Sequence, residues 1–269
     1  MNSKISSQID KKDNGNIEIV FAVPSEILKA EYQKVLEESA KEAVIPGFRK
    51  GKAPLNKVAE TVSDERATDH ILNHILPKAF ADSVKEHKFN PGMYPKFEVI
   101  KITSTRNITD GTEWQIKAVT CEIPKVVLGN YKTKIKGKTV DEIAKEITQI
   151  INLEIPDILI QEEVGERLSQ LLVRIEKLGL SLEGYLKSVG KSVEQLRSEY
   201  QDEAKRAISL ELILNEVANE EKIDVGEDKV DEFIKTTGYD PKAVGDEQRK
   251  MLKRIVIRRE ALEKLASKV

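Results

Sequence analysis

The first part of the chain alternates between stretches of strand period and stretches of helix period. Residues 16–23 place an apolar side chain at every second position, the pattern of a half-buried strand, and the turn-forming Asp-Asn-Gly at 13–15 precedes them. Residues 2–10 are the candidate hairpin partner. Two further strands are predicted at 96–105 and 113–123. The positions expected to face the core in the strands at 16–23 and 113–123 are Ile17, Ile19, Phe21, Val23, Trp114, Ile116, Ala118 and Thr120.

Two helical stretches are predicted between these strands. One begins at Pro24 and extends to about residue 43, and the second begins at Pro54, a residue suited to a first helical turn. The second stretch extends to about residue 87, with a break expected at Ser63 and a bend at Pro77. The N-terminal part therefore combines a small sheet with long helices.

From Thr139 onward the pattern is helical. Apolar residues within 156–178 recur in steps of four, three, four and three, which is typical of a helix that packs against another long helix. Gly179 ends this helix, Gly190 separates a short helix from the next long one, and at least two more helices follow by residue 267. The predicted contact positions on the two long helices are Val164, Leu168, Leu171, Ile175 and Leu178, then Val193, Leu196, Tyr200, Ala204 and Ile208.

These patterns predict the fold class. We expect an α+β N-terminal domain (a small antiparallel sheet plus long helices) over residues 1–125, and an all-α domain with long helical arms over residues 139–269. Residues 126–138 are predicted to form a linker. A chain of 269 residues has room for two domains, and a composition of 5% aromatic and 33% charged residues favours long exposed helices over a compact β-rich enzyme.

The net charge of −2 conceals an asymmetry along the chain. Residues 1–130 carry 19 Lys+Arg and 18 Asp+Glu, residues 131–138 add four lysines, and residues 139–269 carry 21 basic and 28 acidic residues. An acidic body repels phosphates at short range, which argues against a general coat on nucleic acid and against DNA as a partner. Any contact with a polyanion must therefore be local.

Cysteine usage and apolar runs bound the cellular setting. The single cysteine, Cys121, excludes a disulfide framework within the chain and fits a reducing compartment. The first 20 residues show no apolar segment before a small-residue cleavage site, so no signal peptide is predicted. No run approaches the roughly 18 apolar residues of a membrane-spanning helix. We therefore expect a soluble, cytoplasmic protein with no membrane partner.

Candidate catalytic and metal sites are weak. His70 and His74 stand four residues apart, a spacing that can hold a metal, but no Glu follows the first histidine and no third ligand is evident. Cys121 falls inside a predicted strand, where packing is the simpler role. No phosphate-binding glycine motif and no nucleophile elbow are present. We expect no catalytic residues, no metal and no cofactor.

A basic run at 249–260 is predicted to form an amphipathic helix. Its apolar side consists of Leu252, Ile255, Val256 and Ile257. Such a run is more often a solvated helix face than a binding surface. Binding of an acidic partner is the alternative.

The loop at 44–54, with the sequence VIPGFRKGKAP, is the most informative segment. Pro46 favours an extended Ile45, and two glycines can adopt backbone angles that lift the residues between them. Two interpretations of Phe48 remain open on physical grounds. Its ring could fold back onto the domain core, or it could project and stack on an unpaired base or enter an apolar crevice while the neighbouring cations meet phosphates. The candidate binding residues are Gly47, Phe48, Arg49, Lys50, Gly51 and Lys52.

Two segments resemble the bacterial trigger factor family. The stretch PGFRKGKAP resembles its ribosome-binding signature, Gly-Phe-Arg-x-Gly-Lys-x-Pro, and residues 151–225 resemble its C-terminal domain, notably through EIPDILIQEEV and GLSLEGYLKSVGKSVEQL. The resemblance implies docking of Phe48, Arg49 and Lys50 beside the exit tunnel of the large ribosomal subunit. The implied partners are an exit-site ribosomal protein, neighbouring rRNA, and unfolded or nascent polypeptides.

The chain departs from the family in one respect. Trigger factors usually carry a prolyl isomerase domain between these two regions, whereas here roughly fifteen residues separate Pro124 from Thr139, and a domain needs about 50. We therefore expect no isomerase activity. The resemblance implies an ATP-independent chaperone in which the docking loop holds the protein at the ribosome. Long helical arms then shield hydrophobic segments. Candidate lining residues, which the sequence cannot distinguish from core residues, are Leu180, Leu182, Tyr185 and Leu186.

Three alternative functions remain. The first is a ribosome-assembly or translation factor that docks without holding clients. The second is a peptidyl-prolyl isomerase, as in full-length family members. The third is an extracytoplasmic chaperone, because the helical C-terminal part also resembles periplasmic chaperones linked to parvulin domains; the lack of a predicted signal peptide argues against it.

Overall fold

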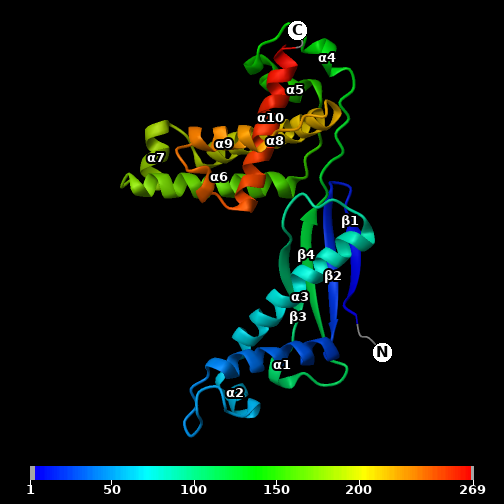
Figure 1. Cartoon of the computed structure of the whole chain (residues 1–269), viewed down its shortest axis with the longest axis vertical. Helices are drawn as coiled ribbons and strands as arrows, with labels where there is room; N and C mark the ends of the chain where they lie inside the picture. The colour runs from blue at the N-terminus through cyan, green and yellow to red at the C-terminus, as the bar shows by residue number, and fades with distance from the viewer. Residues whose placement is uncertain (1–3, 268–269) are drawn as a thin grey trace. The chain divides into compact units, whose positions relative to one another are not determined.

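The computed structural model describes residues 4–267, which divide into two compact units with the boundary between Ile123 and Pro124 (Figure 1). The elements of the first unit are β1 (Ser6–Lys11), β2 (Asn16–Pro24), α1 (Ser25–Glu42), α2 (Leu55–Thr61), α3 (Asp64–His87), β3 (Lys96–Lys101), the 3-10 turn η1 (Thr105–Asn107) and β4 (Glu113–Cys121).

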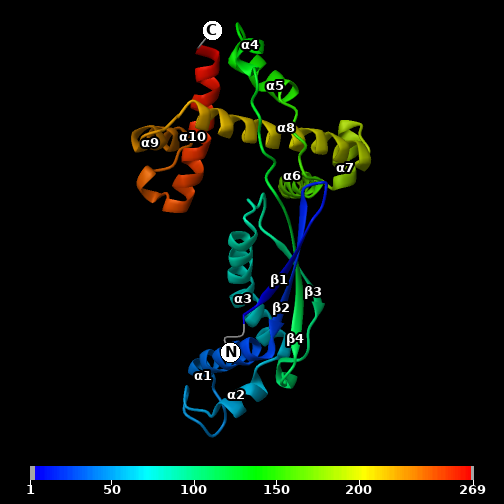
Figure 2. The same ribbon diagram turned by 90° about the vertical axis from the view of Figure 1, so that its right-hand side faces the viewer.

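The four strands form one antiparallel sheet in the order β1-β2-β4-β3. All the positions predicted to face the core on β2 and β4 are buried, which confirms the two-residue period. The predicted hairpin partner also forms: β1 pairs with β2 over Ser6–Lys11, although residues 2 and 3 lie outside the described part. Helix α3 covers one face of the sheet (Figure 2), and its Ile71, Ile75 and Leu76 pack in the same core as Phe21 and Trp114.

The helix break predicted at Ser63 is confirmed in this unit. Ser63 separates α2 from α3, and its side chain accepts a hydrogen bond from the Arg66 N–H as an N-cap. Pro77 lies inside α3, which continues to His87. The predicted strand at 96–105 is too long, because β3 ends at Lys101 and Ser104 and Thr105 turn instead to bond Asp64 at the start of α3.

The second unit is helical. Its elements are α4 (Tyr131–Lys134), α5 (Val140–Ile150), α6 (Asp157–Lys177), α7 (Leu182–Val189), α8 (Val193–Glu220), α9 (Glu227–Thr236), the 3-10 turn η2 (Pro241–Ala243) and α10 (Asp246–Ser267). Helix α8 contacts α5, α6 and α10. Capping boxes at Thr139 and Ser192 start α5 and α8, and Gly190 ends α7 in the left-handed conformation, so the predicted stop and restart are confirmed.

The segment 126–138, expected as a linker, packs onto the second unit. Leu128, Tyr131 and Ile135 are buried in the same core as Ile143 and Ile213. The sequence signal was the apolar spacing of 128, 131 and 135, which is that of a helical turn packed on a core. Four lysines in this short segment obscured that spacing.

Three apolar positions expected inside are exposed. Leu178 is 71% exposed at the C-cap of α6, Val193 is 54% exposed as the first residue of α8, and Ile255 is 41% exposed on α10. The central predicted positions Leu171 and Leu196 are buried. Leu178 and Val193 thus continue the apolar periods of α6 and α8 to the helix ends, where they are no longer covered.

Candidate functional site

The loop between α1 and α2 is anchored at its base and exposed at its tip. Ala43 and Ile45 on one side, and Ala53 and Leu55 on the other, pack partly buried against the core of the first unit. Residues 46–50 between them are all exposed. Two apolar attachments on each side hold the ends of the loop close to the helices, so the intervening residues project from a defined base.

Two successive turns shape this tip. The Phe48 N–H donates to the Ile45 carbonyl over 3.0 Å, and Gly47 has a φ of +87°. With Pro46 at the second position and a positive φ at the third, this is the type II turn that such residues favour. The Lys52 N–H then donates to the Arg49 carbonyl over 2.9 Å, again closing a four-residue turn.

Glycine is needed at Gly51 for a second reason besides its φ of +77°. A Cβ at this position would lie 3.3 Å from the Lys41 carbonyl oxygen near the end of α1, whereas a Cβ at Gly47 would meet nothing within 4 Å. The loop therefore folds back closely onto α1 at Gly51 and is open at Gly47. Both glycines allow the backbone angles that shape the loop.

Phe48 does not fold back onto the core. Its side chain is 42% exposed and is absent from the residues that pack in the core cluster, so of the two interpretations the projecting one describes this structure. Val44, which sequence reasoning left out, is 79% exposed beside the loop. The signal for it was an apolar residue placed after a helix end and directly before Ile-Pro.

The cations of the loop are unpaired. Arg49, Lys50 and Lys52 are exposed, and within residues 4–267 they make no side-chain hydrogen bond or ion pair. By contrast, nearby Lys34 and Lys57 pair with Glu31 and Glu60. Three charges that are not neutralised, next to an exposed aromatic ring, can attract an anionic surface and bury one ring against it.

Helices α1 and α3, which support this loop, are joined by two histidine–carboxylate contacts. His74 Nδ1 lies 2.5 Å from Glu31 Oε2, and His70 Nε2 lies 2.9 Å from Glu38 Oε2. Partial burial raises the pKa of Glu31, but hydrogen bonds from Lys34 and His74 outweigh it and hold that pKa below its ordinary value. Each histidine therefore contacts a different carboxylate, and the two rings are not directed at a common metal position. Among the described residues no group of three metal-binding side chains comes together.

A second exposed surface, the apolar arm, lies on α6, α7 and α8. Its members share substantial exposure despite being aliphatic: Leu172, Val173, Leu178, Leu180, Leu182, Val189 and Val193. The four lining candidates separate here, because Leu180 and Leu182 are exposed while Tyr185 and Leu186 pack against Leu171 and Leu196. Single residues of this arm could not be assigned from sequence, since core and exposed leucines share one helical period.

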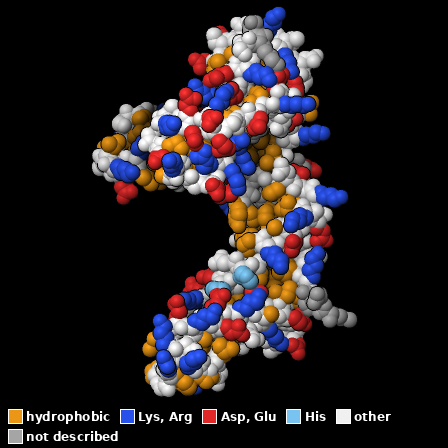
Figure 3. Space-filling model, viewed as in Figure 1, with side chains coloured by type: hydrophobic (Ala, Val, Ile, Leu, Met, Phe, Trp, Pro, Cys, Tyr) orange, Lys and Arg blue, Asp and Glu red, His pale blue; other side chains and the backbone are white. Residues whose placement is uncertain are grey.

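Several charged groups near the apolar arm are paired. Lys187 pairs with Glu183, Lys191 with Glu199, and Arg167 with both Glu163 and Glu203. Apolar, acidic and basic side chains are interspersed over this part of the second unit (Figure 3), so the arm exposes apolar area among charges of both signs.

The remaining candidates from sequence have structural roles. The basic run 249–260 is largely paired within the chain, with Arg249 bound to Glu227 and Asp231, and Arg258 to Glu211. Cys121 is buried, and burial raises the pKa of its thiol, so it packs rather than reacts. Within the described residues no helix is long and apolar enough to cross a membrane.

The chain thus combines a four-stranded sheet covered by α3, an exposed basic loop between two helices, and an all-helical unit that follows them. Such a chain belongs to the class of two-domain α+β and all-α proteins. The family model for the bacterial trigger factor protein matches residues 5–152, and that for the C-terminus of the bacterial trigger factor protein matches residues 116–267. The chain belongs to the bacterial trigger factor family. Residues 116–152 fall in both matches, so the N- and C-terminal regions of the family follow one another directly in this chain.

Curated relatives support this assignment. The chain is 26% identical over 151 residues to a trigger factor of Bdellovibrio bacteriovorus. This alignment covers 53% of this chain and 33% of the relative. It is 28% identical over 145 residues to a trigger factor of Lactiplantibacillus plantarum (51% and 32%) and 29% identical over 143 residues to one of Clostridium kluyveri (53% and 32%). The matched part thus spans about a third of each relative's length.

A solved structure described as that of the trigger factor chaperone, in work on substrate recognition in folding and assembly, has a similar fold. It superposes with a TM-score of 0.65 at 12% identity, covering 97% of this chain and 99% of the other. The predicted family and fold class are confirmed.

Proposed function

We propose that this chain is an ATP-independent chaperone that docks on the large ribosomal subunit and shields hydrophobic segments of nascent chains in the cytoplasm. The observation that carries the proposal is the docking loop, residues 44–54, in which an exposed Phe48 stands among three cations that have no partner in the described structure. The proposed partners are an exit-site ribosomal protein, adjacent rRNA, and unfolded polypeptides.

The chemistry of the loop supports docking on a surface that is both anionic and creviced. Arg49 offers a planar fork for phosphate or carboxylate oxygens, while Lys50 and Lys52 act as mobile point charges. Burying the Phe48 ring adds an apolar contribution, since a fully buried phenylalanine gains about 1.5–3 kcal/mol and this ring is 42% exposed beforehand. Gly47, Gly51 and the two turns hold these groups in one orientation, which lowers the entropy lost on binding.

The apolar arm supports the holding function. Its exposed leucines and valines offer several small apolar contacts without fixed hydrogen-bond geometry. Each contact is weak, so an unfolded segment binds through many of them and leaves once burial in its own core is more favourable. No nucleotide is required for such an exchange.

We also propose that the chain lacks prolyl isomerase activity. This is supported by the overlap of the two family matches and by the ten residues or so between β4, which ends at Cys121, and α4, which begins at Tyr131. An isomerisation assay on a prolyl peptide with the purified chain is expected to show the uncatalysed rate. Clear turnover would contradict this part of the proposal.

Ribosome co-sedimentation tests the docking loop. The variant Phe48→Ala/Arg49→Ala/Lys50→Ala is expected to leave the ribosome pellet, while the unsubstituted chain remains in it. A matched control, Tyr94→Ala/Arg66→Ala/Lys85→Ala, removes one exposed aromatic ring and two exposed cations elsewhere in the same unit and should pellet normally. Equal pelleting of all three proteins would show that the loop is not the docking site.

Aggregation suppression distinguishes the chaperone from a ribosome-assembly factor. A denatured client diluted into the purified chain should stay soluble at a near-stoichiometric ratio, without ATP. Docking without any protection of the client would favour the assembly factor.

A further inference from the structure

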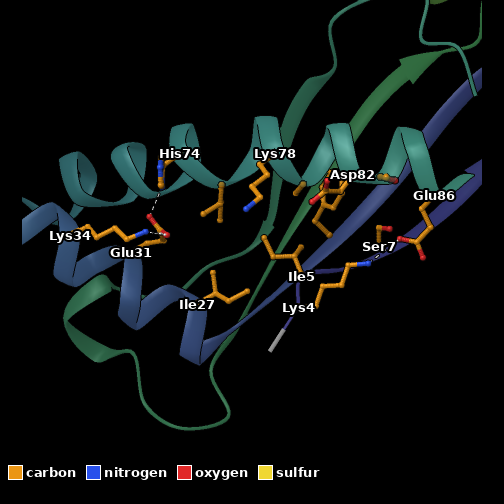
Figure 4. Close-up of a pocket in the computed structure, with 14 residues that line it drawn as sticks. Lys4, Ile5, Ser7, Ile27, Glu31, Lys34, His74, Lys78, Asp82 and Glu86 are labelled. Carbon is orange, nitrogen blue, oxygen red and sulfur yellow. Dashed lines mark hydrogen bonds and ion pairs between the residues drawn. The ribbon is translucent and has the colours of Figure 1, made fainter. Parts of the chain in front are cut away.

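A groove of about 580 Å³ lies in the first unit, away from the docking loop (Figure 4). Helix α3 forms one wall, α1 closes one end, and β1 with the residues just before it forms the opposite side. The floor is apolar and is made by Ile5, Phe21, Ile27, Ile75 and Ala79. Its volume falls within the range of pockets that bind ligands.

The α3 wall presents a polar residue every fourth position, His74, Lys78, Asp82 and Glu86, which places them on one face of the helix (Figure 4). The outer two are engaged, His74 with Glu31 and Glu86 with Lys4. Lys78 and Asp82 between them form no ion pair or side-chain hydrogen bond within residues 4–267.

A buried hydroxyl adds an unsatisfied polar group to this wall. Ser83 is 2% exposed, it lines the groove, and its Oγ has no hydrogen-bond partner in the described structure. Buried polar atoms are nearly always satisfied, so an orphan in a groove points to a ligand group. The groove therefore offers one cation, one anion and one hydroxyl over an apolar floor.

The opposite side of the groove is a sheet edge whose free backbone groups can be assigned. The Lys12 N–H donates to the Asn16 carbonyl, and pairs along an antiparallel ladder alternate between hydrogen-bonded and not. Ser6, Gln8 and Asp10 are therefore the β1 residues that bond to β2. Ser7, Ile9 and Lys11 direct their N–H and C=O groups outward, where the described residues form no further strand.

We propose that this groove binds an extended polypeptide segment, which adds as a fifth strand along the outer edge of β1. The backbone of the segment bonds to Ser7 and Ile9, a known mode of peptide recognition at sheet edges. Every second side chain of the segment points into the groove. An acidic and a basic side chain at adjacent inward positions pair with Lys78 and Asp82, and an apolar side chain at the next inward position rests on the floor.

The spacing of the groove fits this occupant. Residues four apart on a helix are separated by about 6 Å along its axis, and alternate side chains of a strand by about 6.6 Å. An acidic and a basic residue two positions apart in the segment therefore match Lys78 and Asp82 at a comparable interval. A single small zwitterion would use the charges but would leave the Ser7 and Ile9 backbone groups unpaired.

This site is independent of the proposed ribosome docking, because none of the loop residues lines it. It is also separate from the apolar arm, which belongs to the other unit. Loss of docking in the loop variant would leave peptide binding in the groove unchanged, so the two proposals fail separately.

Fluorescence anisotropy with a labelled peptide Thr-Leu-Thr-Glu-Thr-Lys-Thr, capped at both ends, tests the proposal on the full chain. This probe puts Leu, Glu and Lys on one face of a strand, with the two charges two positions apart. The control Thr-Leu-Glu-Thr-Lys-Thr-Thr has the same composition with the charges on the other face, and it should bind about tenfold more weakly. N-methylation of one alternate set of probe residues should abolish binding, and methylation of the other set should leave it unchanged.

Protein variants locate the contacts. The probe and its charge-exchanged form, Thr-Leu-Thr-Lys-Thr-Glu-Thr, should differ in affinity by about fivefold, and the variant Lys78→Glu/Asp82→Lys should invert that preference. Lys85→Glu, on the same helix but outside the groove, should not change it. Hydrogen exchange of the folded chain supplies a readout that needs no variant: peptide should slow exchange of the Ser7 and Ile9 amides and leave those of Gln8 and Asp10 unchanged.

Several results would overturn the proposal. They are equal affinity for the alternating and permuted peptides, protection that spares Ser7 and Ile9, or no binding at millimolar peptide. Concentration-dependent protection of Ser7 and Ile9 without peptide would show that the edge pairs with a second copy of this chain, and that would also overturn it.

Discussion

The docking loop and the apolar arm both expose apolar side chains, yet they differ in the charges around them. At the loop one aromatic ring lies among three unpaired cations, whereas at the arm seven aliphatic side chains lie among charges of both signs, several of which are paired. Unpaired cations give long-range attraction and orientation, and aliphatic area gives short-range, non-directional contact. The first arrangement suits one defined partner surface, and the second suits many different unfolded segments.

The largest expected effect is a difference in salt dependence between the two regions. If all three loop cations contact phosphates, raising monovalent salt from about 50 to about 200 mM should weaken ribosome binding roughly 20- to 40-fold, because each contact contributes about −0.7 to −0.9 to the logarithmic slope. Binding of an unfolded client at the arm should change less than about twofold. Equilibrium binding at four salt concentrations measures both, and Lys50→Ala should reduce the ribosome slope by about 0.7–0.9. Equal slopes for ribosome and client would remove the distinction.

The next effect concerns the arm. The variant Leu178→Ser/Leu180→Ser/Val193→Ser is expected to weaken client binding about tenfold, because it removes exposed apolar area that the client would cover. Ribosome binding should be unaffected, and aggregation suppression with co-sedimentation reports both.

A matched control for the arm variant is Val127→Ser/Met251→Ser/Ile255→Ser, which alters exposed apolar residues of the same unit outside α6–α8. If this control weakens client binding to the same extent, the arm has no special role. Circular dichroism should show similar melting of all three proteins, since the altered side chains are exposed.

A smaller effect separates the two loop glycines. Gly51→Ala should weaken ribosome binding about fivefold, because alanine there combines an unfavourable φ with a Cβ 3.3 Å from the Lys41 carbonyl. Gly47→Ala carries only the conformational cost, without the steric contact, and should therefore weaken binding less. Co-sedimentation of the two variants side by side measures the order, and the opposite order would contradict the described loop geometry. Client binding at the arm should not respond to either change.

The smallest effect lies in the first unit at the start of α3, where Asp64 holds the segment after β3. Asp64 accepts hydrogen bonds from Ser104 and from the N–H and hydroxyl of Thr105; burial raises its pKa, but these bonds outweigh burial and lower it below the ordinary value of 3.8. A lowered folded-state pKa gives stability that is present above 3.8 and is lost as the pH falls through the folded value. Asp64→Asn should therefore lose about 1 kcal/mol in urea unfolding at neutral pH.

At strongly acidic pH the Asp64→Asn difference should shrink toward zero, because the native carboxyl is then protonated as well. A difference that stays constant with pH would show that the carboxylate charge is not what stabilises this junction. The arm residues are all aliphatic and carry no carboxylate. Asp64→Asn should therefore leave client binding at the arm unchanged.

Much of the fold could be predicted because local pattern and tertiary environment agree there. The two-residue period of 16–23 identified every buried position on β2, and Ser63 and Gly190 marked helix ends through capping chemistry that acts within a few residues. The GFRKGK loop stood out for the same reason, since its turns depend on Pro46 and two glycines that are close in sequence.

The errors have a common cause. Leu178, Val193 and Ile255 follow the helical period yet are exposed, and Leu128 and Tyr131 lie in an apparent linker yet are buried. Whether a periodic apolar residue is covered depends on where its partner helix ends, which is a property of the tertiary arrangement and not of its neighbours in sequence. The groove beside β1 was invisible for the same reason, because its walls come from segments more than 60 residues apart.

The sequence by itself determined the strand and helix order, the faces of the central strands and the position of one basic aromatic loop, since backbone periodicity and turn chemistry are local. Only the tertiary structure decided that Phe48 projects, that its neighbouring cations are unpaired, and which arm leucines are exposed. Exposure and charge pairing are set by what packs or fails to pack against a side chain, and that depends on residues far away along the chain.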